Sequence, residues 1–307
     1  MTDNTSTTPA GWYADPVQPA LQRYWDGFAW TSATAPVSSP EWRDSALPQV
    51  AEQPHEPHVS GSGLRQVYAP PSGAWGLGDI GWFVLVVIGT IIVSAVVVVP
   101  VFFVADDAFT SDGGINGESA AGSWLLTGAQ ALFFAGLAAW PLVIAWRKSD
   151  GWRRAYGFVV SWRAVWIGVV GGLVTLTAMV VLTEVTARIL DEEVTSAGAD
   201  AAESMTGSTA AFVLFLLLIA VGAPFVEELA FRGLVWGAVV KRGWSPWLAT
   251  VIAGVPFALL HVEPLRVAPL LAAGVVLGVI RQYGGLAGAM LAHCVVNTIG
   301  VIGIVAQ

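Results

Sequence analysis

Long uncharged apolar runs constrain this chain more than any other feature. Gly81–Val104 is 24 residues without a charge, Trp124–Trp146 is 23 and Ala164–Thr183 is 20. About 20 helical residues cross a hydrocarbon core of about 30 Å, at about 1.5 Å per residue. The composition agrees, because 12% of the residues are charged, against about a quarter in soluble domains, and the mean hydropathy is +0.66. The predicted fold class is therefore all-α, a polytopic bundle of transmembrane helices.

Seven segments are predicted to span the membrane. The fourth, Thr209–Val240, is longer than a span requires and is interrupted at Gly222–Pro224, so it is either one kinked helix or a span that leads into a second segment. Glycines four residues apart are predicted to let helices pack closely. They are Gly233 and Gly237, Gly274 and Gly278, and Gly284 and Gly288. The last three predicted spans are Trp244–Leu260, Val267–Ile280 and Leu286–Ala306.

The loop charges alternate in sign along the chain. Basic residues follow spans two, four and six, whereas the intervening loops are acidic, and Arg266 is the exception, with Glu263 beside it to offset its charge. Basic loops stay in the cytoplasm, so the N-terminus is predicted there and the C-terminus outside. Arginine outnumbers lysine twelve to two, which indicates a GC-rich bacterial genome and hence a bacterial plasma membrane. The basic residues are Arg147, Lys148, Arg153, Arg154, Lys241, Arg242 and Arg281, and the acidic ones are Asp106, Asp107, Asp112, Glu118, Asp191, Glu192, Glu193, Asp200 and Glu203.

The polar N-terminal part is predicted to lie outside the membrane. Residues 1–35 form a Trp-rich module with two short strands joined at Asp26-Gly27, residues 36–75 form a disordered Pro-rich linker, and 76–307 form the membrane domain. The pattern GWY-D-P…RYWDG-x-W resembles the short Trp-rich domain of unknown function found at the cytoplasmic end of bacterial membrane proteins. That resemblance implies a recognition or packing module, for which we expect a protein partner. Nothing resembles a nucleic-acid footprint.

Two adjacent carboxylates and an arginine interrupt the fourth apolar segment. A charged residue at mid-membrane depth costs about 2.5–3.5 kcal/mol even on the lenient insertion scale, so such residues usually serve a function. Glu228 and Arg232 are four residues apart and can pair on one helix face. Glu227 points about 100° away and has no such built-in partner. We therefore predict that Glu228 and Arg232 hold the helix and that Glu227 does the chemistry.

The membrane domain contains two histidines, each paired with a residue four positions away. Phe257 and His261 share a face of the fifth span, and His293 and Asn297 share a face of the seventh. Glu227 and His261 lie about 21 and 23 Å along their helices from the turn between the two spans, so they are predicted to lie level. Two carboxylates, two imidazoles, an arginine and an amide can thus converge inside the bundle.

This set of side chains suits the activation of water. A carboxylate beside an imidazole can take a proton from water, and a second imidazole and an amide can donate to a developing oxyanion. The same residues could instead hold a divalent ion, since Glu227, His261 and His293 are of the types that bind Zn²⁺. The sequence lacks His-Glu-x-x-His, so the helix of the familiar zinc proteases is excluded.

Three motifs in order resemble one family. Glu227-Glu228…Arg232, Phe257…His261 and His293…Asn297 are similar to the motifs of the CPBP family, the CAAX-prenyl-protease-like and bacteriocin-processing (Abi) intramembrane proteases. The resemblance covers roughly residues 205–305. It implies hydrolysis of a peptide bond in a membrane-associated peptide or protein, with water activated between Glu227 and His261 and the oxyanion stabilised by His293 and Asn297. The family has been described both as metalloproteases and as glutamate-dependent enzymes without metal, so the expected cofactor is Zn²⁺, another divalent metal or none.

Two other functions are compatible with the same residues. The first is a non-catalytic protein that binds a membrane peptide as an immunity or scaffold protein, and it shares every motif with the enzyme. The second is a transporter, which internal repeats would favour, and the sequence shows no such repeats. The predicted function is therefore an intramembrane endopeptidase in a lipid bilayer, with the non-catalytic binder as the alternative.

Overall fold

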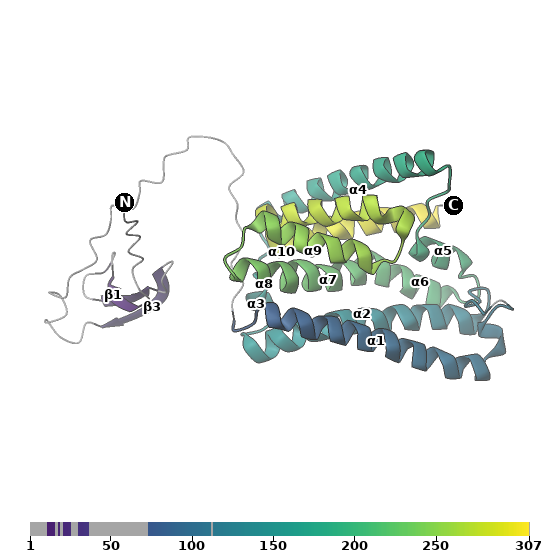
Figure 1. The fold of residues 1–307 in the computed structure, drawn as a ribbon, viewed down its shortest axis with the longest axis horizontal. Helices are drawn as coiled ribbons and strands as arrows, with labels where there is room; N and C mark the ends of the chain where they lie inside the picture. The colour runs from purple at the N-terminus through teal and green to yellow at the C-terminus, as the bar shows by residue number, and fades with distance from the viewer. Residues whose placement is uncertain are drawn as a thin grey trace, which may run out of the picture. The chain divides into compact units, whose positions relative to one another are not determined.

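The computed structural model describes residues 11–15, 18, 21–25, 30–36, 73–111 and 113–306. The chain divides into two compact units, Met1–Gly63 and Leu64–Gln307, and each is described by itself (Figure 1). The predicted linker 36–75 lies almost wholly outside the described residues, so the predicted domain limits stay predictions.

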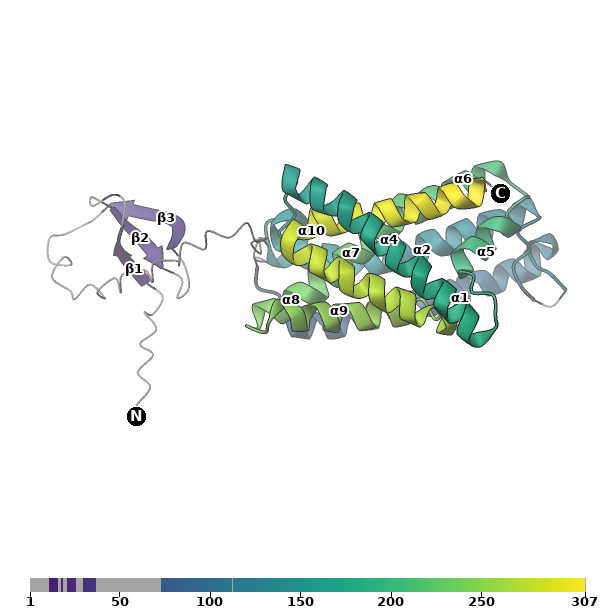
Figure 2. The same cartoon turned by 90° about the horizontal axis from the view of Figure 1, so that it is seen from above.

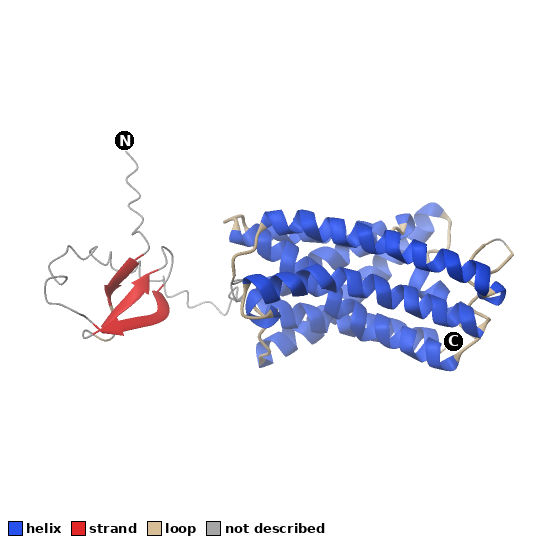
Figure 3. Ribbon diagram, turned by 90° about the horizontal axis from the view of Figure 1, so that it is seen from below, coloured by secondary structure: helices blue, strands red, loops and turns tan. Residues whose placement is uncertain are grey.

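The N-terminal unit contains a three-stranded antiparallel sheet (Figure 3). Its strands β1 (Gly11–Ala14), β2 (Leu21–Trp25) and β3 (Trp30–Pro36) pair in chain order. Trp12 lies opposite Tyr24, and their rings meet edge to face with centroids 5.4 Å apart. The sheet thus has one strand more than predicted, and the predicted Asp26-Gly27 turn lies outside the described residues.

The membrane unit is a bundle of helices that run side by side (Figure 1), and this confirms the all-α prediction. Serine side chains cap the N-termini of several of these helices, as at α2, where Ser119 accepts from the backbone of Gly122. The long helices are α1 (Leu77–Val104), α2 (Ala120–Lys148), α4 (Trp162–Leu190), α9 (Pro246–Leu260) and α10 (Val267–Val305). The short ones are η2 (Asp106–Ala108), α3 (Trp152–Ala155), α5 (Ala197–Ser204) and η5 (Pro264–Arg266).

One continuous helix, Thr209–Lys241, occupies the place of the fourth predicted span. It does not break at Gly222–Pro224. Instead, two wider π-helical segments lie on either side of the glutamates. The first ends two residues before Pro224, whose missing amide leaves a carbonyl one turn earlier without its usual partner. Along the chain it consists of α6 (Thr209–Leu217), η3 (Leu218–Gly222), α7 (Ala223–Glu228), η4 (Leu229–Val235) and α8 (Trp236–Lys241).

The last two predicted spans are the two arms of α10, two helices that meet at a sharp kink at Gly285. This residue has φ 71° and ψ −176°, a conformation that glycine adopts readily. The two arms diverge from this bend (Figure 2). Within the described residues, five helices are long and apolar enough to span a membrane, with α10 among them, and α9 is a shorter apolar helix of 15 residues. The protein is therefore an integral membrane protein.

Glycines bring the helices of the core into close contact. A Cβ atom placed on Gly274 would lie 2.9 Å from the carbonyl oxygen of Gly254, so α10 and α9 touch backbone to backbone there. A Cβ atom on Gly172 would lie 2.7 Å from the carbonyl oxygen of Ala292, so α4 approaches the second arm of α10 in the same way. Small residues at such contacts let membrane helices gain dispersion energy that bulkier side chains would prevent.

Candidate active site

The two adjacent glutamates face different surroundings. The Glu228 side chain is fully buried and points at Arg232, whereas Glu227 is 8% exposed and lines an internal cavity. One residue of helix rotation separates them, as the sequence predicts. Both sit at the end of α7, directly before the second π segment.

Glu228 and Arg232 form the predicted ion pair, with Arg232 Nη1 2.8 Å from Glu228 Oε1. Arg232 also donates from Nη2 to the carbonyl oxygen of Gly274 at 3.0 Å, and its guanidinium lies 4.4 Å from the centroid of the Phe257 ring. A buried guanidinium is tolerated only when its charge and its N–H groups have partners. Arg232 thereby ties the glutamate helix to both α9 and α10.

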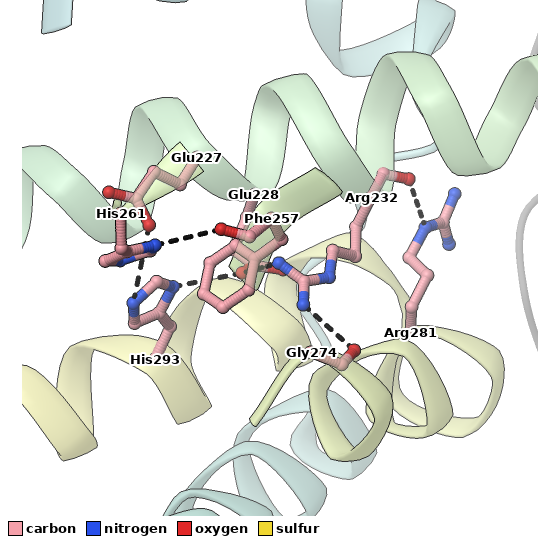
Figure 4. Close-up of polar contacts among 8 residues, drawn as sticks. All are labelled: Glu227, Glu228, Arg232, Phe257, His261, Gly274, Arg281 and His293. Carbon is pink, nitrogen blue, oxygen red and sulfur yellow. Dashed lines mark hydrogen bonds and ion pairs between the residues drawn. The ribbon is translucent and has the colours of Figure 1, made fainter. Parts of the chain in front are cut away.

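His293 lies between the two carboxylates (Figure 4). Its Nδ1 is 3.0 Å from Glu228 Oε1, and its Nε2 is 3.9 Å from Glu227 Oε2. Glu228 Oε1 also accepts from Arg232, which can only donate, so this oxygen acts as an acceptor and His293 Nδ1 donates to it. In a neutral imidazole the lone pair is then on Nε2, on the side of Glu227.

His261 is fixed in a similar way at the end of α9. Its Nδ1 donates to the carbonyl oxygen of Phe257 at 2.9 Å, because a carbonyl can only accept, and its ring packs 5.1 Å from the Phe257 ring. Nε2 of the neutral ring is again the acceptor. Phe257 also contacts the His293 ring, with centroids 5.8 Å apart, so this one ring supports both histidines.

Asn297 donates from Nδ2 to the carbonyl oxygen of Ile219 at 2.9 Å. Ile219 lies in the first π segment, where the wider turn interrupts the regular hydrogen-bond ladder and offers a carbonyl to a side chain. The amide has a second N–H, and Asn297 is also among the residues that line the cavity.

The cavity has a volume of about 310 Å³, which is enough for a short stretch of peptide side chains and water. Glu227, His261, His293 and Asn297 line it, whereas Glu228 and Arg232 lie behind its wall. The structure thus brings together the predicted residues and divides them into four that face the cavity and two that support them.

An arginine from the end of span six supports the site from outside the cavity. The sequence predicts that Arg281 is a basic loop residue. This prediction is wrong, because the Arg281 side chain is fully buried. Its Nε donates to the carbonyl oxygen of Arg232 at 3.2 Å and its Nη2 to that of Tyr156 at 2.9 Å. The Arg232 carbonyl lies in the second π segment. Arg281 therefore donates a hydrogen bond to a backbone carbonyl of this segment, as Asn297 does to one of the first. No motif in the sequence distinguishes Arg281 from the exposed basic residues of the other loops.

The cavity side chains meet only part of what a divalent metal requires. Both histidines donate from Nδ1 and leave Nε2 available, which is how metal-ligating histidines are oriented. Glu227 Oε2 is a buried oxygen without a hydrogen-bond partner among the described residues. No group of three His, Cys, Asp or Glu side chains in that part of the chain is spaced to hold a metal, however. The donor chemistry fits a metal, and the observed spacing does not.

The bundle is apolar, and it buries carboxylates and imidazoles beside a cavity. These features define the class of the protein, which is an integral membrane protein with an intramembrane site. Residues 209–299 match the family model of the type II CAAX prenyl endopeptidase Rce1-like proteins, and residues 10–42 match DUF2510, a family of proteins of unknown function. All three motifs fall within the first match, which confirms the predicted resemblance. At the level of the family it supports a CAAX-type intramembrane protease with a membrane-associated peptide or protein substrate. No curated protein and no solved structure matches the chain significantly.

Proposed function

We propose that the protein is an intramembrane endopeptidase that hydrolyses a peptide bond in a membrane-associated peptide or protein. One observation carries this proposal. The Glu227 carboxylate is nearly buried, has an oxygen without a hydrogen-bond partner among the described residues, and lines a cavity together with two imidazoles whose Nε2 atoms are not used by the scaffold. A purely structural glutamate at this depth would instead be paired as Glu228 is.

In this proposal Glu227 is the general base. It takes a proton from a water in the cavity, with His261 Nε2 as the second acceptor that orients this water. The resulting hydroxide attacks the carbonyl carbon of the substrate, and the proton held by Glu227 then passes to the leaving amine. Both groups face the cavity, so water and substrate can reach them together.

The oxyanion would be stabilised from the opposite side of the cluster. Asn297 offers its second N–H, and His293 offers Nε2–H once it carries a second proton. Glu228 accepts from His293 Nδ1 and is itself held by Arg232, so it fixes the imidazole with Nε2 facing Glu227. Glu228 and Arg232 are therefore positioning residues in this proposal, and Glu227, His261, His293 and Asn297 are catalytic.

A metalloprotease is the alternative mechanism. Glu227, His261 and His293 would hold the ion, which would supply a Lewis acid and lower the pKa of its bound water. Metal analysis of the purified protein, together with activity after treatment with a chelator, decides between the two mechanisms. Stoichiometric metal and activity that returns only when metal is added back would favour the metalloenzyme.

The test of the proposal compares the terminal peptides of membrane and secreted proteins in cells that carry the wild-type chain or Glu227→Gln at equal expression. Glu184→Gln is the matched control, because Glu184 lies exposed on α4 and pairs with Arg188. We expect a new terminus with the wild type and the control but not with Glu227→Gln. If Glu227→Gln gives the same termini and retains function, the protein is a non-catalytic peptide binder.

A further inference from the structure

The cavity extends from the middle of the bundle to one end of the membrane unit. Besides the site residues, its lining includes Ser196 and Ala197 at the start of α5, and Glu263 and Arg266 from the connection between α9 and α10. His261 is the C-cap residue that follows α9, about 22 Å along the helix from Pro246. His261 therefore lies at the same end of the unit as Glu263 and Arg266, which follow it closely in the chain.

A network of polar contacts crosses this end of the cavity. Glu263 Oε1 accepts from the backbone N–H of Ala197 at 2.7 Å, and Glu263 Oε2 pairs with Arg266 Nη1 at 2.5 Å. We call these three residues the mouth. The mouth joins the loop before α5 to the loop after α9, two segments that are 66 residues apart in the chain. It is polar and partly exposed, unlike the apolar walls of the bundle.

The charges of the two ends of the unit differ. Asp191, Glu192 and Glu193 are exposed in the loop that leads to the mouth. The opposite end holds exposed arginines, Arg153 and Arg154 after α2 and Arg242 after α8. This contrast does not depend on Arg281, because that side chain is buried. Because basic loops are retained in the cytoplasm, the acidic end and its mouth belong outside.

We infer that the cavity opens on the extracytoplasmic face, and that its substrate is a polypeptide segment that reaches the membrane from that side. The statement about the substrate rests on the proposed function, whereas the direction in which the cavity opens does not. It excludes the cytosolic C-terminal tail of a lipid-anchored protein as the substrate. It favours the membrane-proximal part of an exported or anchored protein.

The direction of opening can be measured by cysteine labelling in spheroplasts. The single cysteine is first replaced, as Cys294→Ala, and Ala197→Cys then probes the mouth. Ala197 is exposed, and it contributes only its backbone N–H to the mouth. Asp150→Cys probes the opposite end, at an exposed residue whose pairing with Arg154 contributes little to stability. A membrane-impermeant maleimide should label Ala197→Cys in intact spheroplasts, and Asp150→Cys only after the membrane is opened.

A third probe tests the cavity itself. Gln130 lines it from α2 and is half-buried, so Gln130→Cys should react with a small charged methanethiosulfonate added outside. Labelling of Asp150→Cys in intact spheroplasts, or no labelling of Ala197→Cys there, overturns the inference. So does a Gln130→Cys that fails to react from outside. None of these readouts needs catalysis, so a failure of the proposed protease activity remains distinguishable from a failure of the topology.

Discussion

Glu227 and Glu228 show how one residue of helix rotation separates two roles. The Glu228 carboxylate is held by Arg232 and His293, whereas the Glu227 carboxylate faces the cavity. Glu228 compensates the charge of Arg232, which also depends on Phe257 and on the Gly274 carbonyl. The stability of the bundle should therefore depend on the second glutamate far more than on the first.

Glu228→Gln should destabilise the membrane unit by about 3–5 kcal/mol, because it leaves the Arg232 guanidinium buried without its counter-charge. Glu227→Gln should change the free energy of unfolding little, since the Glu227 carboxylate has no cation at bonding distance. Unfolding of the two variants in detergent measures the difference. Equal destabilisation by both substitutions would contradict this division of roles.

Tyr156 gives the membrane unit a pH dependence that is independent of the site. Burial, and after it the negative charge of Asp79, raises the pKa of Tyr156 above its usual value, and its hydroxyl donates to the carbonyl oxygen of Pro141 at 2.7 Å. A pKa that is higher in the folded than in the unfolded state stabilises the fold below about pH 10, and this contribution is lost as the pH rises further. The melting temperature should therefore fall above about pH 10. Tyr156→Phe should remove most of that fall, and an unchanged alkaline profile in this variant would refute the assignment.

At the scale of the element, the composite helix Thr209–Lys241 is the feature that the sequence specifies least. The Gly-Ala-Pro sequence predicts an irregularity but not its form, and the observed form is two π segments that flank the glutamates. Each π segment has a carbonyl that accepts from a side chain of α10, Ile219 from Asn297 and Arg232 from Arg281. The shape of this helix is therefore determined by tertiary partners that local sequence does not contain.

The α9–α10 contact should tolerate no added methyl group at Gly274. Gly274→Ala would bring its Cβ within 2.9 Å of the Gly254 backbone, which cannot rotate away, and would displace the carbonyl that Arg232 uses. We expect a destabilisation of about 1–3 kcal/mol, the usual cost of overpacking. Gly300→Ala is the matched control, because a Cβ atom there meets nothing within 4 Å. Thermal unfolding of both variants checks this, and equal stabilities would show that the helices can separate at no cost.

The sequence predicts the convergence of the site well, for identifiable reasons. Spacing of four residues fixes Glu228 with Arg232, and Phe257 with His261, because helix geometry alone determines these pairs. The level placement of Glu227 and His261 follows from counting residues from a shared turn, and both line the same cavity. The burial of Arg281 depends on contacts with residues 49 and 125 positions away, which no local pattern encodes.

At the scale of the whole molecule, the membrane unit combines two kinds of segment. Five helices have the length and apolarity of full spans, whereas α9 ends after 15 residues at the histidine of the site. The acidic and basic ends of the unit are distinct, and the site lies near the acidic end. The bacterial plasma membrane and the cytoplasmic N-terminus remain predictions that the labelling experiment addresses in part.

The shortness of α9 has a consequence for the lipid around it. A helix of about 22 Å cannot match a hydrocarbon layer of about 30 Å, so lipid beside His261 must thin or its headgroups must sink toward the residue. Such local thinning of the bilayer, here called a dent, would bring water to the site without the movement of a lid. Turnover in proteoliposomes should then decrease as acyl chains lengthen, because a thicker bilayer makes the dent costlier, while the melting temperature changes less. Constant turnover across acyl-chain lengths would mean that water enters only through the mouth. The bilayer would then have no part in supplying water, the second reactant.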